Sequence, residues 1–202
     1  YTPGLQARNA AFFASAQAPD FLLWRHATID GRFATLDGGP ALLELLSAYA
    51  PLAIENGFVL WRRYPQPAAA YALRPLQGLS VALDEWFRLP PGPLWMQLEI
   101  AETWWGRLAG FLVRPQQTFL EVQLEDGSMF NFRLVPGNCR AGFLMNPMLL
   151  GELAPAQLYH PRRPRIHAVA ARIHCQHPTQ IKASVRVTLS AIAGIPVLEN
   201  AR

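Results

Sequence analysis

The chain has 202 residues, of which 51% are hydrophobic and only 16% are charged, below the roughly 25% charged residues of an ordinary soluble domain. Its formal net charge is +4, and Lys182 is the only lysine. The arginines are spread along the sequence, and no basic stripe alternates with stacking aromatic residues, so nucleic-acid binding is not expected. No apolar run reaches the ~18 residues that a membrane-spanning helix requires.

So little charge leaves less polar surface to cover the exterior. This favours either a surface that meets a partner, a membrane or a glycan, or a large and well-filled core. The chain opens at Tyr1 without a basic or apolar leader pattern. Both a mature secreted protein and a domain excised from a larger protein fit this start, and we favour the excised domain.

The first 65 residues predict a small unit that mixes helices and strands. Residues 1–18 place apolar side chains at helical spacing, and Pro40 is suited to the first turn of a second helix that runs to Tyr49. Asn56-Gly57 is a strong hairpin dipeptide between two short apolar runs. The expected order is therefore helix, strand, loop, helix and hairpin, over residues 1–18, 21–24, 25–39, 40–49 and 52–63.

Beyond the proline-containing stretch 64–70, the best linker in the chain, hydrophobicity alternates with a period of two. Asp126-Gly127 joins two clearly alternating runs and predicts a hairpin. We therefore predict a mainly β fold, α+β overall: the unit 1–65, then a jelly-roll-like antiparallel β-sandwich over 66–202. Its expected strands are 79–83, 94–100, 108–113, 118–124, 129–135, 142–145, 165–174 and 181–192, with a long loop and a helical turn at 154–159 before the seventh.

The polar residues form no motif that specifies a reaction. Four of the five histidines lie between His160 and His177, but no pair has the spacing of metal ligands on one helix, so we expect no metal. The sequence lacks a nucleophile elbow and a glycine-rich phosphate loop, and no cofactor is expected. Cys139 and Cys175 are the only cysteines; two buried thiols or a single disulfide between them both fit the pattern.

Tryptophans near polar residues form the best candidate binding set. Aromatic rings offer an apolar surface to sugar rings, and arginine or glutamate side chains bind their hydroxyl groups. On residue type alone, the candidates are Trp86, Trp95, Glu102, Trp104, Trp105, Arg107 and Arg133. The same region suggests a different class of protein, a glycoside-processing or glycosyl-transferring enzyme that uses Glu99 or Glu102 and needs two carboxylates across a cleft.

The loop at Asp30-Gly31-Arg32 is the second candidate site. Its two charged residues could close the turn as a local ion pair. Alternatively, Arg32 could face an anion beside the N-terminus of the helix that begins near Pro40, where free N–H groups point outward.

One ordered series of segments comprises residues 21–24, 29–32, 37, 42–49, 58–63, 126–127, 132–136 and 142–147. Together they resemble the soluble C-terminal region of bacterial polytopic inner-membrane proteins of unassigned function, which are similar to multi-spanning glycosyltransferases that use lipid-linked sugars. Asn146 departs from the serine of the corresponding pattern. The resemblance implies an extracytoplasmic, periplasmic domain tethered through upstream helices, and it transfers no catalytic residue.

These observations predict a non-catalytic extracytoplasmic domain of a larger membrane protein. It is expected to recognise a glycan or a partner protein in cell-envelope polysaccharide metabolism. The enzyme named above is one alternative. Another is a scaffold that docks on the membrane portion of its own polypeptide, which predicts a contiguous exposed apolar patch and no deep pocket.

Overall fold

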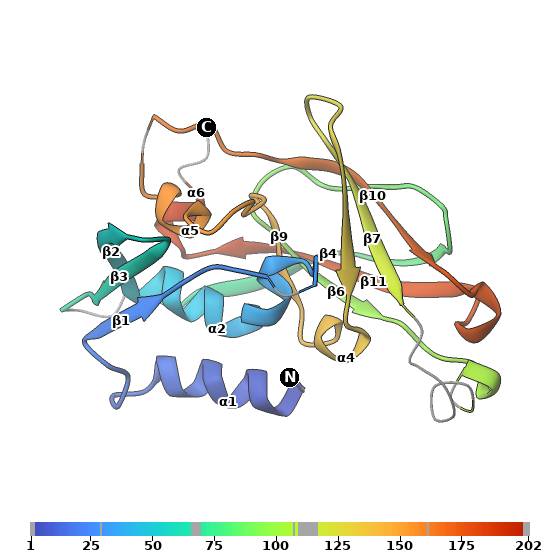
Figure 1. Cartoon of the computed structure of the whole chain (residues 1–202), viewed down its shortest axis with the longest axis horizontal. Helices are drawn as coiled ribbons and strands as arrows, with labels where there is room; N and C mark the ends of the chain where they lie inside the picture. The colour runs from blue at the N-terminus through green and yellow to red at the C-terminus, as the bar shows by residue number, and fades with distance from the viewer. Residues whose placement is uncertain are drawn as a thin grey trace.

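The computed structural model describes residues 3–28, 30–65, 70–106, 108, 117–160 and 162–199. The N-terminal part follows the predicted order, and its three strands form one antiparallel sheet, β1-β3-β2. Figure 1 shows this small sheet at one end of the molecule, with α1 and α2 beside it. Its elements are α1 (Pro3–Ala14), β1 (Phe21–Trp24), α2 (Ala34–Ala48), β2 (Tyr49–Glu55) and β3 (Phe58–Arg63).

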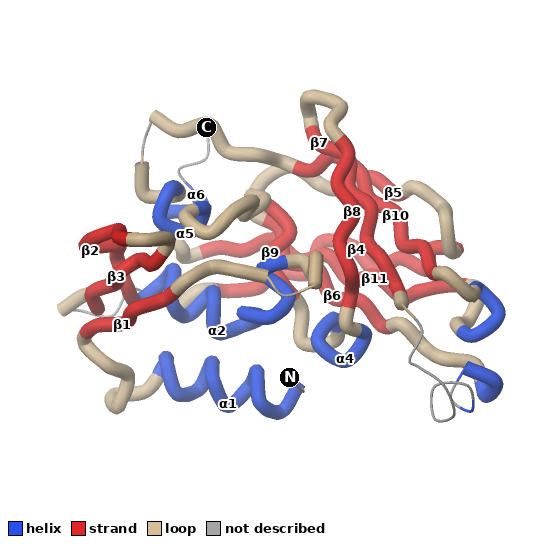
Figure 2. The backbone as a smooth tube through the Cα atoms, viewed as in Figure 1, coloured by secondary structure: helices blue, strands red, loops and turns tan. Residues whose placement is uncertain are grey.

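Eight further strands form two antiparallel four-stranded sheets, in the orders β5-β10-β7-β8 and β4-β11-β6-β9. Successive strands alternate between the two sheets, apart from the β7–β8 hairpin. This is the jelly-roll topology, so the predicted fold class is confirmed. The strands, red in Figure 2, are β4 (Ala72–Ala82), β5 (Phe87–Arg88), β6 (Leu94–Glu99), β7 (Thr118–Leu124), β8 (Met129–Leu134), β9 (Phe143–Asn146), β10 (Ala168–Cys175) and β11 (Ser184–Ala193).

Short helical segments lie between several of these strands and after the last one. They are α4 (Pro136–Cys139), α5 (Ala154–Gln157), η1 (Pro178–Gln180) and α6 (Pro196–Glu199). The predicted helical turn at 154–159 is α5. No helix in the described part of the chain is both long enough and apolar enough to cross a bilayer.

The space between the two large sheets is the main hydrophobic core. Alternation along β7 turns Leu120 and Val122 inward, and both are 0% exposed. They belong to one buried cluster with Met96 of β6 and Val187 of β11. Each such fully buried aliphatic side chain contributes roughly 1.5–3 kcal/mol. The period of two in the sequence therefore becomes the packing of one sheet on the other.

A second core lies on the outer side of the β4-β11-β6-β9 sheet. Trp95 of β6 and Leu144 of β9 point outward there and are buried against α2 and the small sheet, whose contributions include Leu43, Leu46 and Trp61. The small unit thus covers part of one face of the sandwich. The outward side chains of the β5-β10-β7-β8 sheet belong to neither buried cluster.

Helix α2 begins earlier than predicted. The sequence suggested a loop up to residue 39, but a first helical segment runs from Ala34, and a kink at Gly39 (φ 46°, ψ −139°) separates it from the segment that starts at Pro40. The Gln6 amide of α1 fills the kink and donates to the Leu36 carbonyl over 2.8 Å. Contact with another helix, which local sequence does not reveal, stabilises this irregular turn.

Two strands differ from expectation because pairing with a distant strand determines them: pairing lengthens β4 and forms β5. β4 begins at Ala72 rather than Leu79, although it contains Pro75 and Gly78, because it pairs with β11 along its whole length at the sheet edge, where proline is tolerated. β5 has only two residues and was not predicted. The predicted strand 108–113 falls almost wholly outside the described residues. The boundary between 65 and 66 adjoins such residues and stays a prediction.

Candidate functional site

The outer surface of the β5-β10-β7-β8 sheet is the candidate site, which we call the open face. Strand register places its side chains in rows: Ala170 of β10 lies beside Gln123 of β7, Arg172 beside Glu121, and His174 beside Phe119. Every one of these side chains is exposed or half-buried, whereas the alternate residues are buried. The open face comprises Trp86, Arg88, Phe119, Glu121, Gln123, Met129, Asn131, Arg133, Ala170, Arg172 and His174.

Contacts between side chains hold the middle of the open face in place. Arg172 Nε donates to Glu121 Oε2 over 2.5 Å, and its guanidinium lies 5.0 Å from the centroid of the Trp86 ring. The His174 ring stacks on Phe119 with an interplanar angle of 14°. These groups are positioned before any ligand arrives, which lowers the entropy cost of binding.

A shallow pocket of about 370 Å³ lies at one end of the open face. Ala170 lines the base of this pocket, and its single methyl group leaves space between the longer side chains around it. Arg88 and Gln123 line the pocket beside Ala170, and Trp86 and Met129 add apolar surface. Such a mixture of an aromatic ring, an amide and a guanidinium suits a ligand with one apolar face and several hydroxyl groups.

Two of the predicted binding residues lie on the open face. Trp86 is 38% exposed beside β5, and Arg133 projects from β8. The Asp30–Arg32 loop lies along the edge of the same strand: the Arg133 amide donates to the Gly31 carbonyl over 2.9 Å. Asp30 approaches the Arg133 guanidinium at 3.8 Å.

The local Asp30–Arg32 ion pair that would close the loop is not the arrangement observed. Arg32 lies 3.8 Å from Asp37 in the first turn of α2, while Asp30 faces Arg133. The Arg32 guanidinium is also mostly covered, with 24% of its side chain exposed. Its role toward an anion stays a prediction, and its buried Nε has no hydrogen-bond partner among the described residues.

Trp95 cannot contact a ligand as predicted, because it is 1% exposed in the second core. Its position on β6 points outward from the sandwich. The small unit then covers that part of the sheet. Only the packing of one unit on the other decides that this ring is core.

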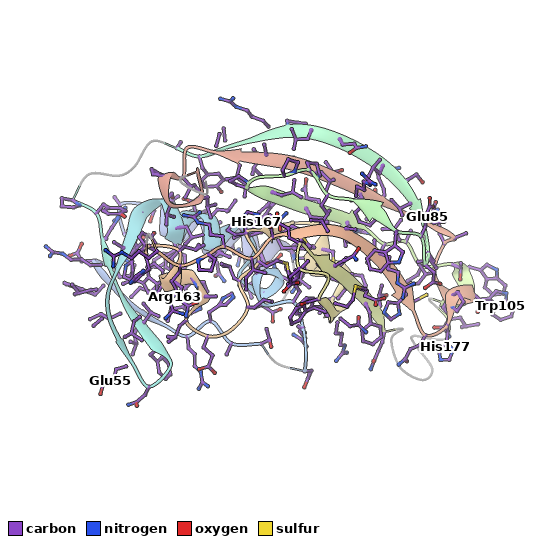
Figure 3. The ribbon with its side chains drawn as sticks, turned by 90° about the horizontal axis from the view of Figure 1, so that it is seen from above. Glu55, Glu85, Trp105, Arg163, His167 and His177 are labelled. Atoms are coloured by element: carbon purple, nitrogen blue, oxygen red, sulfur yellow. The ribbon has the colours of Figure 1, made fainter. Side chains whose placement is uncertain are left out.

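Trp104 and Trp105 lie on a surface segment that follows β6, away from the shallow pocket. They are 62% and 58% exposed, and their rings stack on each other at 3.8 Å. Thr103 and Gly106 hold the segment against η1: the Thr103 hydroxyl donates to the Thr179 carbonyl over 3.0 Å. Figure 3 shows Trp105 at one end of the molecule near His177. Arg107, the predicted hydrogen-bonding residue beside them, lies outside the described residues.

The carboxylates of the enzyme alternative do not share a pocket. Glu99 lines a shallow pocket with Arg140 and Arg186, and its Oε2 accepts a 2.6 Å hydrogen bond from Arg186. Glu102 is exposed and is not among the residues that line this pocket. Glu99 is therefore arranged as a surface ion pair rather than as one half of a catalytic pair across a bond.

The histidines are dispersed over the molecule. His26 is buried beneath β1, His174 is on the open face, and His177 lies at the far end near Trp105. Within the described residues, no group of three or more histidine, cysteine or acidic side chains could hold a metal ion. Burial lowers the pKa of His26 from 6.5 to about 4, while a hydrogen bond with the Leu149 backbone opposes this shift.

Cys139 is a free thiol, so it forms no disulfide with Cys175. The α4 turn places Cys139 at 0% exposure in the sandwich core, whereas Cys175 is half-buried at the end of β10. Burial raises the pKa of the Cys139 thiol to about 12. Of the two predicted alternatives, two buried thiols or one disulfide, Cys139 is a buried thiol.

Most of the open face was missing from the sequence-based set. The sequence alone does not identify five of its polar residues as binding residues: Arg88, Glu121, Gln123, Arg172 and His174. One signal was present, because alternation along residues 118–124 assigns Phe119, Glu121 and Gln123 to a single face. The positions of Arg88 and Arg172 depend on the pairing of β5 and β10 with β7, which has no local signature.

No protein-family model, curated protein sequence or solved structure matches this chain. Its functional reading therefore depends on the chemistry of its own surfaces.

Proposed function

We propose that this chain is a non-catalytic recognition domain that binds a glycan on the open face. The observation that carries the proposal is the composition of that face. Guanidinium, carboxylate, amide and imidazole groups occupy its outward positions, together with Trp86 over a shallow pocket. Strand register spaces these groups regularly on a rigid sheet.

A sugar ring fits this chemistry better than an apolar or a highly charged ligand. Trp86 and Met129 provide apolar contact for the C–H face of a sugar ring, while Arg88 and Gln123 provide donors and an acceptor for its hydroxyl groups. Glu121 and Arg172 largely neutralise each other. The pocket is shallow, so binding along an extended oligosaccharide is favoured over capture of a single small molecule.

The resemblance to the C-terminal region of bacterial inner-membrane proteins supports an extracytoplasmic, periplasmic location. In that setting the domain would be tethered to a membrane portion of the same polypeptide. The glycan would then be a component or intermediate of cell-envelope polysaccharide.

An array of bacterial cell-envelope oligosaccharides, probed with fluorescently labelled protein, tests the proposal. Trp86→Ala removes the ring beside the pocket, and Gln123→Ala removes a polar group without disturbing the core. Each is expected to weaken binding about tenfold or more, because buried contacts at the centre of a site dominate its affinity. Trp104→Ala is the matched control, since Trp104 is also exposed but lies away from the pocket.

Loss of binding in both face variants, with Trp104→Ala like the wild type, supports the open face as the site. Loss only in Trp104→Ala would move recognition to the Trp104–Trp105 stack and overturn this assignment. A wild-type protein that binds no oligosaccharide on the array would overturn the function itself.

A further inference from the structure

A second, larger cleft lies at the opposite end of the sandwich from Trp105. It has a volume of about 930 Å³ and is bounded by the β5–β6 turn, residues 158–160, 162–165 and 167–169, and the start of α6. Figure 3 shows Arg163 on the side of the molecule away from Trp105 and His177, with His167 nearer the middle. The volume is in the upper part of the range for small-molecule sites.

The segment that forms one wall is anchored at both ends. Before it, the Tyr159 hydroxyl donates to the Tyr49 carbonyl at the end of α2 over 2.7 Å. After it, the buried Asn146 side chain bonds both backbone groups of Ala168, over 3.0 and 2.9 Å. His160 and residues 162–167 are therefore held across the cleft, and Pro164 further restricts the local backbone.

This wall gathers three of the arginines that seemed dispersed in the sequence. Arg162, Arg163 and Arg165 all line the cleft, with Glu125 as the single carboxylate among its described lining residues. The ion pairs of the described residues include none of these three guanidinium groups. Arg165 is half-buried and donates to the Leu198 carbonyl over 3.1 Å.

Positive charge in a concave surface attracts anions, because the low-dielectric walls concentrate the field. With neutral histidines, the described lining side chains leave two formal positive charges in excess over Glu125. The guanidinium group bonds planar and tetrahedral oxyanions through paired N–H donors. Burial lowers the pKa of His167; the charge of Glu125 opposes this shift and the charge of Arg165 adds to it.

We propose that this cleft binds a phosphorylated ligand, either a soluble sugar phosphate or a phosphate headgroup. A phosphate monoester carries about −1.5 to −2 charge near neutral pH, which matches the excess in the cleft better than a single carboxylate does. The cleft is also much larger than one phosphate group, and Tyr64 and Pro91 supply apolar surface for the remainder of the ligand. This site is separate from the open face and does not depend on glycan binding there.

Isothermal titration with glucose 1-phosphate, inorganic pyrophosphate and uncharged glucose tests the site. A second arm uses co-sedimentation with phosphatidylcholine vesicles, with and without phosphatidic acid, to detect a headgroup. The double variant Arg162→Gln/Arg163→Gln removes two exposed guanidinium groups and leaves the anchors intact. Arg186→Gln is the control, because it removes an exposed guanidinium group from the other sheet.

We expect one of the phosphorylated probes to bind and glucose to bind at least tenfold more weakly. The double variant should lose at least tenfold in affinity for the phosphorylated probe, whereas Arg186→Gln should bind it as tightly as the wild type. Binding of the soluble probes identifies a free ligand, and binding confined to phosphatidic acid vesicles identifies a headgroup. Absence of binding in both arms overturns the proposal. So does equal loss in the Arg186→Gln control, which would indicate nonspecific charge attraction. The Trp86→Ala variant should bind the phosphorylated probe normally, which separates this result from the fate of the glycan proposal.

Discussion

His26 illustrates how a single polar residue can be tied to the folded state. It is 5% exposed under β1, its ring packs edge-on against Trp24, and its Nε2 has no hydrogen-bond partner. A charged imidazolium would lose its hydration there, so the ring is neutral in the folded protein. Arg25 and Asp37 line the same small cavity as His26.

This shift predicts that the protein loses stability on acidification. Between pH 6.5 and 4 the unfolded chain takes up a proton at His26 that the folded protein does not. The free energy of unfolding is therefore highest above pH 6.5 and should fall by roughly 3 kcal/mol as the pH approaches 4. Urea unfolding across this range measures the slope.

His26→Asn removes the titration and should flatten that part of the pH profile. The exposed His177→Asn serves as the control and should keep the wild-type slope. If His26→Asn shows the same pH dependence as the wild type, the acid sensitivity arises elsewhere.

At the scale of elements, contact with α1 determines the backbone conformation at the kink in α2. Gly39 has a positive φ, and a Cβ there would lie 3.0 Å from Nε2 of Gln6. Gly38, its neighbour, is not in the left-handed region and would place a Cβ 3.4 Å from Leu42. Two adjacent glycines thus differ in what the fold requires of them.

Gly39→Ala should lower the free energy of unfolding by roughly 1–3 kcal/mol, because an L-residue is strained in that conformation. Gly38→Ala should be neutral within about 1 kcal/mol, since alanine favours the helix and meets only an ordinary close contact. Thermal and urea unfolding of the two variants compare them directly. Equal destabilisation would show that the kink places no special demand on Gly39.

The sequence predicts those hairpins and strands that depend on a few neighbouring residues, and it does not predict those that depend on pairing with a distant strand. Asp126-Gly127 forms the expected turn between β7 and β8, and the Ser128 amide donates to the Asp126 carboxylate over 2.9 Å. β5 has two residues and exists only because β10 pairs with it. The open face follows the same division: one strand of it was visible as alternation, while its neighbours were assigned by pairing.

For the whole molecule, α2 joins the two hydrophobic cores. Leu36, near its start, lies in the sandwich cluster, and Leu43 and Leu46 lie in the second cluster with Trp61 and Trp95. A helix that contributes to both cores cannot keep its packing in one of them when the other is lost. The small unit and the sandwich are therefore expected to unfold together.

Leu43→Ala tests this coupling. It should lower the free energy of unfolding by about 2–5 kcal/mol, through lost burial and a residual cavity. Tryptophan fluorescence and far-UV circular dichroism should still give coincident urea transitions, as in the wild type. Leu52→Ala, at a site that is 55% exposed, should change stability little. A fluorescence transition that precedes the loss of β-structure would show two independent units.

The sequence by itself determined the class of fold, because alternation with a period of two, turn dipeptides and prolines act over a few residues and are legible without the rest of the chain. Tertiary structure alone decided which tryptophans became core, that Arg162, Arg163 and Arg165 share a cleft, and that Arg172 lies beside Glu121. Those outcomes follow from which sheet face another unit covers and which distant strands pair. The free energies that decide them come from contacts between residues far apart in the chain.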